Sequence, residues 1–158
     1  NVSISPDGKS IFIYKNNQVG KEKTAGGDIY VSKVGSSGRW GKPKEVAEVN
    51  SSYFESSACI SADGSKMFFT SESADAFHKN IGGSDIYLVE KDTTGKWSSP
   101  KNIGNVVNTE GDEMGVFLHP DGKTLFFASN GHAESFGGYD IYKTVFDKGA
   151  WTKPVNLG

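Results

Sequence analysis

Hydrophobic residues in this chain are grouped in short consecutive blocks and do not recur at helical spacing. The blocks IFIY, MFFT and LFFA, at positions 11–14, 67–70 and 125–128, are each followed by a polar stretch that contains glycine. A block that is apolar at consecutive positions suits a strand buried on both of its faces. The pattern therefore predicts an all-β protein of short strands and tight turns.

Three short motifs recur in the same order along the chain. The first is an Asp-Gly turn within SPDGK, SADGSK and HPDGK, the second is DIY, and the third is a tryptophan followed three residues later by proline. Each motif returns after 54 to 58 residues, which indicates an internal repeat. The nine marker residues are Asp7, Asp63 and Asp121, then Asp28, Asp85 and Asp140, then Trp40, Trp97 and Trp151.

Each repeat can be divided into four strands, named a to d, from its turn residues. Strand a (NVSIS, SSACIS or MGVFLH) ends at the Asp-Gly turn, where glycine can adopt the positive φ that a tight hairpin requires. Strand b is the apolar block, and strand c begins at DIY after a long polar loop. Strand d begins at the tryptophan and contains the proline, which a sheet tolerates best in an edge strand.

Four antiparallel strands in a repeat of this length describe one blade of a β-propeller. The expected blades are residues 1–49, 50–107 and 108–158. Closed propellers typically have about four to eight blades, so three alone would leave two apolar faces open to water. The sequence predicts either a partial ring, completed by further blades, or half of a six-bladed ring formed with a second copy of the chain.

The recurring residues are predicted to have structural roles. The tyrosines of DIY, which are Tyr30, Tyr87 and Tyr142, are expected to pack between neighbouring blades, and the three tryptophans are also expected to pack. The DIY aspartates are expected to accept hydrogen bonds from backbone amides of the loop that each one closes. Catalytic aspartates at three equivalent positions would be unusual, whereas three structural ones are expected.

The composition excludes several classes of partner. With 17 basic and 19 acidic residues, the net charge of −2 provides no basic surface for nucleic acid or for an anionic membrane. No apolar stretch reaches the roughly eighteen residues that a membrane helix needs. The single cysteine, Cys59, cannot form an internal disulfide and is expected to be a small buried residue. Because the chain begins at Asn1 without methionine, we expect it to be a processed or excised piece.

Binding residues are expected on the face that carries the long loops. The strand order puts the b–c loops (15–27, 71–84 and 129–139) on the same face as the d–a connectors (50–55 and 108–113), whereas the other face carries short turns. Loops longer than the fold requires are the usual place for binding. The candidate binding residues on this face are Tyr53, Phe54, Glu55, Phe77, His78, Asp112, Glu113, His132 and Phe136.

The acidic candidates allow more than one interpretation. Glu55, Asp112 and Glu113 could form a ring of carboxylates at the mouth of the central channel, where they would coordinate a cation or receive a basic peptide. We favour the interpretation that Glu55 and Glu113 accept hydrogen bonds from neighbouring blades, because a glutamate recurs at this position. An acid/base pair for glycoside cleavage could be drawn from the same residues, but a catalytic pair would break the repeat symmetry that they follow.

No motif for catalysis or for metal binding accompanies these residues. The sequence contains no HExxH, no Cys-His metal spacing, no GxSxG and no EF-hand loop. His78 and His132, which lie in b–c loops, are expected to be solvated rather than to bind metal. The sequence predicts no catalytic residue, no metal and no cofactor.

The repeat resembles a known family. The order S-P-D-G-K, apolar strand, G-G-x-D-I-Y and W-x-x-P-x-N-L-G is similar to the TolB-like, WD-type propeller repeat of bacterial envelope proteins, and it extends over the whole chain. SNGHAESFGGYDIYK (129–143), WTKPVNLG (151–158) and the N-x-x-x-x-E connectors are similar to the version found in Bacteroidota, often beside an OmpA-like peptidoglycan-binding domain. The resemblance implies a periplasmic or outer-membrane-associated protein, and relatives of this type include a component of the type IX secretion machinery.

These observations favour a non-enzymatic scaffold module of the envelope. It would bind protein partners through its long-loop face, in a secretion assembly or in one associated with the outer membrane and peptidoglycan. One alternative is a carbohydrate-active or peptidase-associated propeller, which a pocket with asymmetric carboxylates would support. Another is a glycan- or peptidoglycan-binding module without chemistry, suggested by the aromatic residues Tyr53, Phe54, Phe77 and Phe136.

Overall fold

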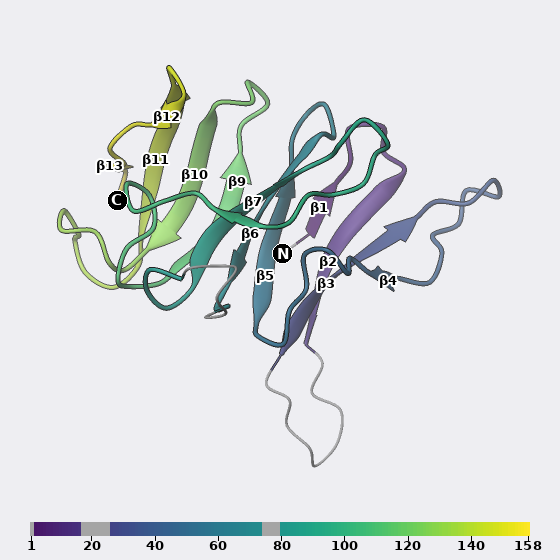
Figure 1. Ribbon diagram of the computed structural model, residues 1–158, viewed down its shortest axis with the longest axis horizontal. Helices are drawn as coiled ribbons and strands as arrows, with labels where there is room; N and C mark the ends of the chain where they lie inside the picture. Colours follow the sequence, from purple (N-terminus) through teal and green to yellow (C-terminus); the bar gives the residue numbers. More distant parts are fainter. Residues whose placement is uncertain (1, 17–25, 74–79) are drawn as a thin grey trace, which may run out of the picture.

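The computed structural model describes residues 2–16, 26–73 and 80–158, and this part of the chain contains no helix, hence none that could span a membrane. Its strands form three antiparallel sheets that follow one another across the molecule (Figure 1). The first sheet contains β1 (Val2–Ile4), β2 (Ser10–Asn16), β3 (Gly27–Lys33) and β4 (Lys44–Glu45), and the second contains β5 (Glu55–Ile60), β6 (Lys66–Ser71), β7 (Asp85–Glu90) and β8 (Lys101–Asn102). The third contains β9 (Glu113–Leu118), β10 (Thr124–Ser129), β11 (Asp140–Asp147), β12 (Ala150–Trp151) and β13 (Val155–Asn156). The predicted all-β fold of three antiparallel blades is confirmed.

The outermost strand of each sheet is interrupted. β4 and β8 are two residues long, and Trp40 and Trp97 pair with the preceding strand region only through isolated bridges. In the third sheet the outermost strand is divided into β12 and β13, which pair with β11 on either side of Pro154. Proline cannot donate a ladder hydrogen bond, so the ladder breaks at the proline that follows each tryptophan.

The hairpins between the first and second strands of each sheet turn at the Asp-Gly motif. Gly8, Gly64 and Gly122 have φ values of 67°, 72° and 70°, which a residue with a Cβ rarely adopts. In each turn the preceding aspartate accepts, through Oδ1, the N–H of the residue two positions ahead at 2.8 to 3.0 Å. The turn chemistry read from the sequence therefore explains these three hairpins.

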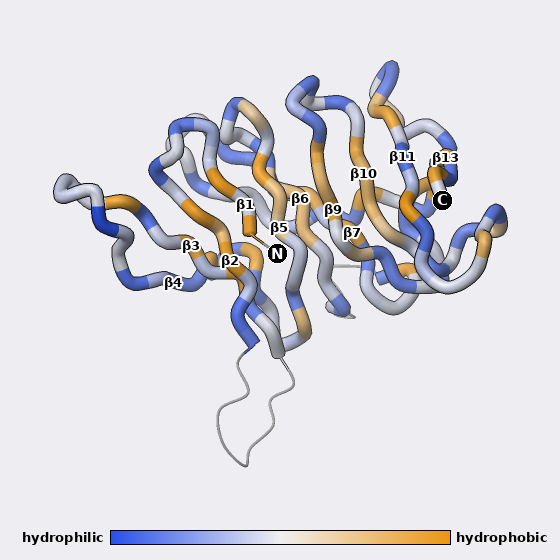
Figure 2. Tube along the Cα trace, turned by 180° about the vertical axis from the view of Figure 1, so that it is seen from behind, coloured by the Kyte–Doolittle hydropathy of each residue, from blue (hydrophilic) through white to orange (hydrophobic). Residues whose placement is uncertain are grey.

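The hydrophobic core consists of two clusters, one between each pair of adjacent sheets. Figure 2 shows the hydrophobic positions concentrated along the central strands. Burying one large apolar side chain contributes about 1.5–3 kcal/mol, so each cluster can hold two sheets together. The cluster between the first and second sheets includes Phe12, Ile29, Met67, Phe69 and Tyr87. The cluster between the second and third sheets includes Phe68, Ile86, Leu125, Phe127 and Tyr142.

Burial depends on where a sheet lies in the row. β6, in the middle sheet, is buried at five consecutive positions, 67–71. β10 is fully buried only at alternate positions, and β2 only at Phe12. The prediction of burial on both faces is correct for β6 and wrong for β2 and β10, because within the described residues only the middle sheet has a neighbour on each side.

The DIY tyrosines follow the same arrangement. Tyr87 and Tyr142 are almost completely buried between sheets, where they stack on Phe69 and Phe127 with ring centroids 5.8 Å apart. Tyr30 lies on the opposite face of the first sheet from Ile29, and its hydroxyl donates to Glu45 at 3.1 Å. Two of the three tyrosines therefore pack between sheets as expected. Of the tryptophans, Trp97 and Trp151 pack at the margins of the two clusters, and Trp40 is 47% exposed.

Candidate functional site

The two connectors that lead onto the long-loop face are fixed to the sheets by asparagine. Asn50 accepts the N–H of Ile29 through Oδ1 at 2.8 Å and donates through Nδ2 to the Ile29 carbonyl at 3.0 Å. Asn108 makes the same pair of bonds with Ile86, both at 2.9 Å. Each side-chain amide satisfies the backbone as a neighbouring strand would, and so holds its connector against the third strand of the sheet that it leaves.

Glu55 and Glu113 accept hydrogen bonds from the same two connectors on their buried side. Both are completely buried and stand at the first positions of β5 and β9. Glu55 accepts hydrogen bonds from the N–H and the hydroxyl of Ser51, at 3.0 and 2.5 Å, and from the hydroxyl of Ser71 at 2.8 Å. Burial raises the pKa of Glu55, and the hydrogen bonds from Ser51 and Ser71 oppose that shift.

Glu113 is held in the same way. It accepts the N–H and the hydroxyl of Thr109 at 2.9 and 2.7 Å, and the hydroxyl of Ser129 at 2.7 Å. The donors come from the connector and from the second strand of the same sheet, so the expectation that neighbouring blades supply them is wrong. Because both carboxylates are buried and bonded beneath their own connectors, Glu55 and Glu113 do not form a ring at the channel mouth.

Asp112 lies nearer the surface and joins loops of two sheets. It accepts the N–H of Ser84 through Oδ1 and the hydroxyl of Tyr139 through Oδ2, both at 3.0 Å. Its own N–H donates to Asn130 at 2.7 Å. A Cβ on Gly83 would lie 2.0 Å from Asp112 Oδ1. The Gly-Gly pair before DIY therefore lets the loop of the second sheet approach the next connector, a role that the sequence analysis missed although the pair is visible in every repeat.

Among the candidates that the structure describes, Phe136 is the most exposed large apolar residue, with 84% of its surface accessible. Its loop is nevertheless fixed. The N–H of Phe136 donates to Asp140 Oδ2 at 2.6 Å, and the hydroxyl of Ser135 donates to the same oxygen at 2.9 Å. Tyr142 donates its hydroxyl to the Glu134 carbonyl at 3.0 Å. Hydrogen bonds, first of all that from the Phe136 N–H, lower the pKa of Asp140.

The second sheet repeats this arrangement at Ile81. The N–H of Ile81 donates to Asp85 Oδ2 at 2.6 Å, and Asn102 donates to the same oxygen at 2.7 Å. Ile81 is 36% exposed, whereas Asp85 is completely buried, and this burial raises the pKa of Asp85. In both loops the DIY aspartate fixes the residue four positions earlier, and that residue presents an apolar side chain to solvent. The corresponding loop of the first sheet lies mostly outside the described residues, and Asp28 stands near the start of β3.

The remaining aromatic candidates differ in their surroundings. Tyr53 is 37% exposed on the first connector. Phe54 is partly buried and packs on Tyr14, with ring centroids 5.4 Å apart, so it is a packing residue as much as a surface one. Phe77 and His78 lie outside the described residues.

His132 is packed rather than solvated, contrary to expectation. Its Nε2 lies 3.0 Å from the Val107 carbonyl, and its ring centroid lies 4.6 Å from that of Tyr142 and 5.9 Å from that of Phe127. The sequence could not reveal this position, because Val107 precedes His132 by 25 residues and meets it only through the fold. His132 therefore links the loop of the third sheet to Val107, the residue just before the second connector.

The central channel offers a different kind of surface. β1, β5 and β9 line a hollow of about 500 Å³, whose walls include Ile4, Ile60, Leu118 and Pro120. No carboxylate is among its lining residues. Within residues 2–16, 26–73 and 80–158, no three His, Cys, Asp or Glu side chains are grouped so as to hold a metal ion. The long-loop face thus has the better-defined candidate residues.

The comparisons with known proteins concern the fold. No protein-family model and no curated protein matches the chain. A TolB-type protein from Agrobacterium tumefaciens superimposes with a TM-score of 0.59 and 21% identity, over 99% of this chain and 47% of that one. This chain has the fold of a TolB-like β-propeller. The TolB-like fold also matches the periplasmic gluconolactonase PpgL of Pseudomonas aeruginosa, with a TM-score of 0.53 and 16% identity, over 92% of this chain and 38% of that one. The chain thus spans less than half the length of either structure.

Proposed function

We propose that this TolB-like propeller is a non-enzymatic interaction module that binds protein partners through its long-loop face. The observation that carries the proposal is Phe136, which is 84% exposed on a loop fixed by hydrogen bonds to Asp140. An exposed aromatic ring on a fixed loop loses little conformational freedom on binding and is typical of interface hot spots. Ile81 presents a second apolar side chain from the equivalent loop.

The burial and hydrogen bonding of the acidic residues favour a binding role over a catalytic one. Glu55 and Glu113 are buried beneath their connectors, and each accepts three hydrogen bonds. Asp112 joins two loops. A general acid or base needs to reach a substrate proton, and these carboxylates are engaged by the protein's own donors.

A glycan-binding module is the second candidate, and the same exposed rings favour it. Phe136 and Tyr139, which are 84% and 47% exposed, lie close together in the sequence of one loop. Aromatic rings provide apolar stacking surfaces for sugars as well as for peptides. Titration with a panel of soluble glycans and peptidoglycan fragments distinguishes this candidate from a protein-binding one.

For the location, we propose the bacterial envelope, either the periplasm or the outer-membrane side, within a secretion or peptidoglycan-associated assembly. The proposal is supported by the resemblance of the repeat to envelope proteins of Bacteroidota and by the TolB-like fold. An adjoining OmpA-like domain remains a prediction from the same resemblance.

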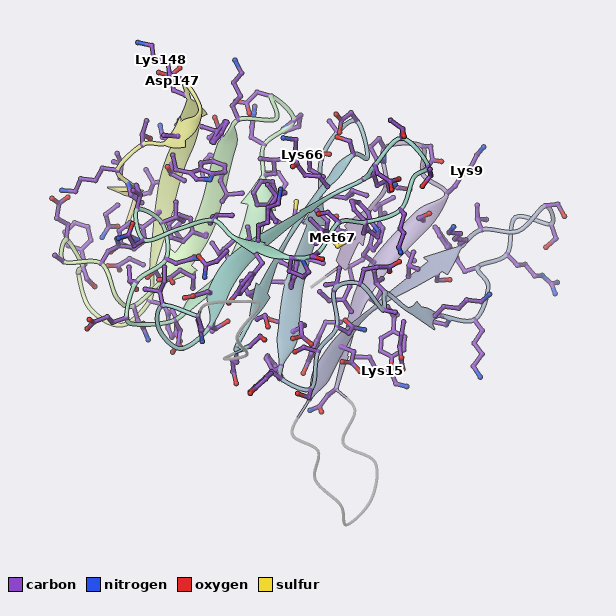
Figure 3. The ribbon with its side chains drawn as sticks, viewed as in Figure 1. Lys9, Lys15, Lys66, Met67, Asp147 and Lys148 are labelled. Atoms are coloured by element: carbon purple, nitrogen blue, oxygen red, sulfur yellow. The ribbon has the colours of Figure 1, made fainter. Side chains whose placement is uncertain are left out.

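A peptide-display selection against the immobilised chain tests the binding proposal. Peptides selected on the wild type should bind Phe136→Ala about tenfold more weakly or worse, because a central aromatic contact is removed. Lys148→Ala is the matched control, since Lys148 lies at the tip between β11 and β12, on the edge opposite Lys15 and the long loops (Figure 3). Equal binding by wild type and Phe136→Ala, or turnover of lactone, glycan or peptide substrates by the wild type, would contradict the proposal.

A further inference from the structure

The exposed apolar side chains around Phe136 belong to segments that contact one another where the second and third blades meet. This Phe136 surface consists of residues 80–84, 108–113 and 129–139. Tyr139 donates its hydroxyl to Asp112 Oδ2, and Asp112 Oδ1 accepts the N–H of Ser84, both at 3.0 Å. Asp112 therefore joins the loop of Phe136 and Tyr139 to the loop of Ile81, and all three of these apolar side chains are exposed.

Charge on the Phe136 surface has one sign. Its three segments contain four acidic residues and neither lysine nor arginine. The four are Glu110, Asp112, Glu113 and Glu134. Glu110 and Glu134 are exposed, and Glu134 Oε1 pairs with Lys153 Nζ at 2.8 Å. Lys153 thus balances Glu134, and the other carboxylates leave the surface negative.

Two buried oxygen atoms beside Ile81 add to the negative potential. Asp85 is completely buried and accepts the N–H of Ile81 through Oδ2 at 2.6 Å. Its Oδ1 atom has no hydrogen-bond partner in the part of the chain that the structure describes, and the same is true of the buried Oδ1 atom of Asn80. Because no nearby donor offsets these acceptors, they favour positive charge on a partner that approaches this loop.

The exposed charge of this surface is not required by the repeat. Both connectors begin with an asparagine that binds a strand and end with a buried glutamate. At the third and fifth positions the second connector has Glu110 and Asp112, where the first has Ser52 and Phe54. Glu110 faces solvent and has no counterpart in the first connector, so its charge is available to a partner.

We propose that the segment bound by the Phe136 surface is basic, with a large apolar side chain that packs on Phe136 and with lysine or arginine residues beside it. This inference rests on the proposed binding function and specifies the chemistry of the partner. The basic side chains face Glu110 and the carboxylates around it, and the exposed rings of Phe136 and Tyr139 add cation–π contacts. Complementary charge speeds association and selects against acidic segments.

The peptide-display selection against the immobilised chain tests this inference without assuming a partner. Peptides whose binding depends on Phe136 should carry more lysine and arginine than the unselected library. Replacing these basic residues by glutamine in the tightest such peptide should weaken its binding about tenfold or more. Its affinity should also fall as the salt concentration rises from about 0.1 M to about 1 M, because the screening length falls from about 10 Å to about 3 Å.

Charge reversal at Glu110 tests whether this surface attracts the basic residues. Glu110→Lys should weaken binding of the selected peptide about fivefold or more. Asp147→Lys is the matched control, since Asp147 is also exposed but lies at the tip between β11 and β12, away from the long loops (Figure 3). It should change the affinity by less than about twofold. Circular dichroism checks that both variants are folded.

The outcomes separate this inference from the proposed function. Phe136-dependent peptides that are neutral or acidic would overturn the inference and leave the binding function intact. Equal losses in Glu110→Lys and Asp147→Lys, or affinity that is insensitive to salt, would also overturn it, because the Phe136 surface would then not select the charge of the peptide. A selection that yields no Phe136-dependent peptide would contradict the proposed function itself, and the inference would fail with it.

Discussion

The side chain of Asn108 is hydrogen-bonded to both the N–H and the carbonyl of Ile86, each at 2.9 Å. Asn108 belongs to the connector and Ile86 to β7, so this pair fixes the position from which the chain enters the third blade. Asn50 and Ile29 form the same relationship one repeat earlier. The asparagine therefore sets where each connector, and the loop face above it, lies relative to the sheet.

Removal of this amide should destabilise the fold. Asn108 is almost completely buried. Asn108→Ala removes the acceptor for the Ile86 N–H and one of the two donors to the Ile86 carbonyl, which still accepts the N–H of Ile103, and it should lower the free energy of unfolding by about 1–3 kcal/mol. Asn105→Ala, at an exposed position three residues before Asn108, should change it by less than about 0.5 kcal/mol. Urea denaturation measures both. Equal effects of the two substitutions would show that the connector does not depend on this pair.

Glu113 is expected to contribute to the stability of the fold rather than to the binding of a partner. Glu113→Ala removes the acceptor for three hydrogen bonds at a fully buried position and should cost at least about 2 kcal/mol in the free energy of unfolding. Glu110→Ala, an exposed change in the same connector, is the control. If Glu113 were a ligand residue, the substitution would instead weaken binding of selected peptides while the urea midpoint stayed unchanged.

Gly83 is expected to tolerate no side chain. In Gly83→Ala the new Cβ would lie 2.0 Å from Asp112 Oδ1, so the Asp112 side chain must move and give up the N–H of Ser84 that this oxygen accepts, at a cost of about 1–3 kcal/mol. Gly35→Ala provides a comparison, because its Cβ would meet no atom nearer than 3.7 Å. Thermal unfolding of the two variants should show a lower midpoint for Gly83→Ala alone.

Acid should remove stability that the Asp-Gly turns provide. Hydrogen bonds, first of all from the Ser61 hydroxyl, lower the pKa of Asp63 from 3.8 to about 2. A carboxyl whose pKa is lower in the folded state stabilises the fold above pH 3.8, and this stabilisation is lost as the pH falls towards 2. Asp63→Asn should therefore show a flatter decline of the melting temperature over this range than the wild type. An identical decline would mean that the Asp63 carboxylate contributes nothing to the stability of the fold. Asp147→Asn is the control for the loss of one negative charge.

The fold could be predicted from the sequence because its signals are local and repeated. Asp-Gly turns, apolar blocks and DIY each specify a few neighbouring residues, and three copies in register identify the blade. The same reasoning missed contacts between distant segments. Three such contacts depend on how the connectors cross the sheets. They are the hydrogen bonds that Glu55 accepts, the contact of His132 Nε2 with the Val107 carbonyl, and the close approach of Gly83 to Asp112. The Asn at the start of each N-x-x-x-x-E connector was the available signal for these contacts.

The candidate site could be predicted only as a face. Topology placed Phe136 and Tyr53 on the long-loop side, but exposure depends on neighbours that the sequence does not reveal. Phe54 packs on Tyr14, whereas Phe136 extends into solvent from a loop held by Asp140. The repeat symmetry that explains the aspartates does not explain the side chains they present, because these differ between Ile81 and Phe136.

Hydrogen–deuterium exchange of the chain with and without a selected peptide tests the proposed binding face most directly. Binding through the long-loop face should slow exchange in residues 129–139 and 80–84 and leave the Asp-Gly turns at 5–9, 61–65 and 119–123 unchanged. Protection confined to those turns, or to the channel strands β1, β5 and β9, would contradict the proposal that this propeller binds its partners through the loops around Phe136.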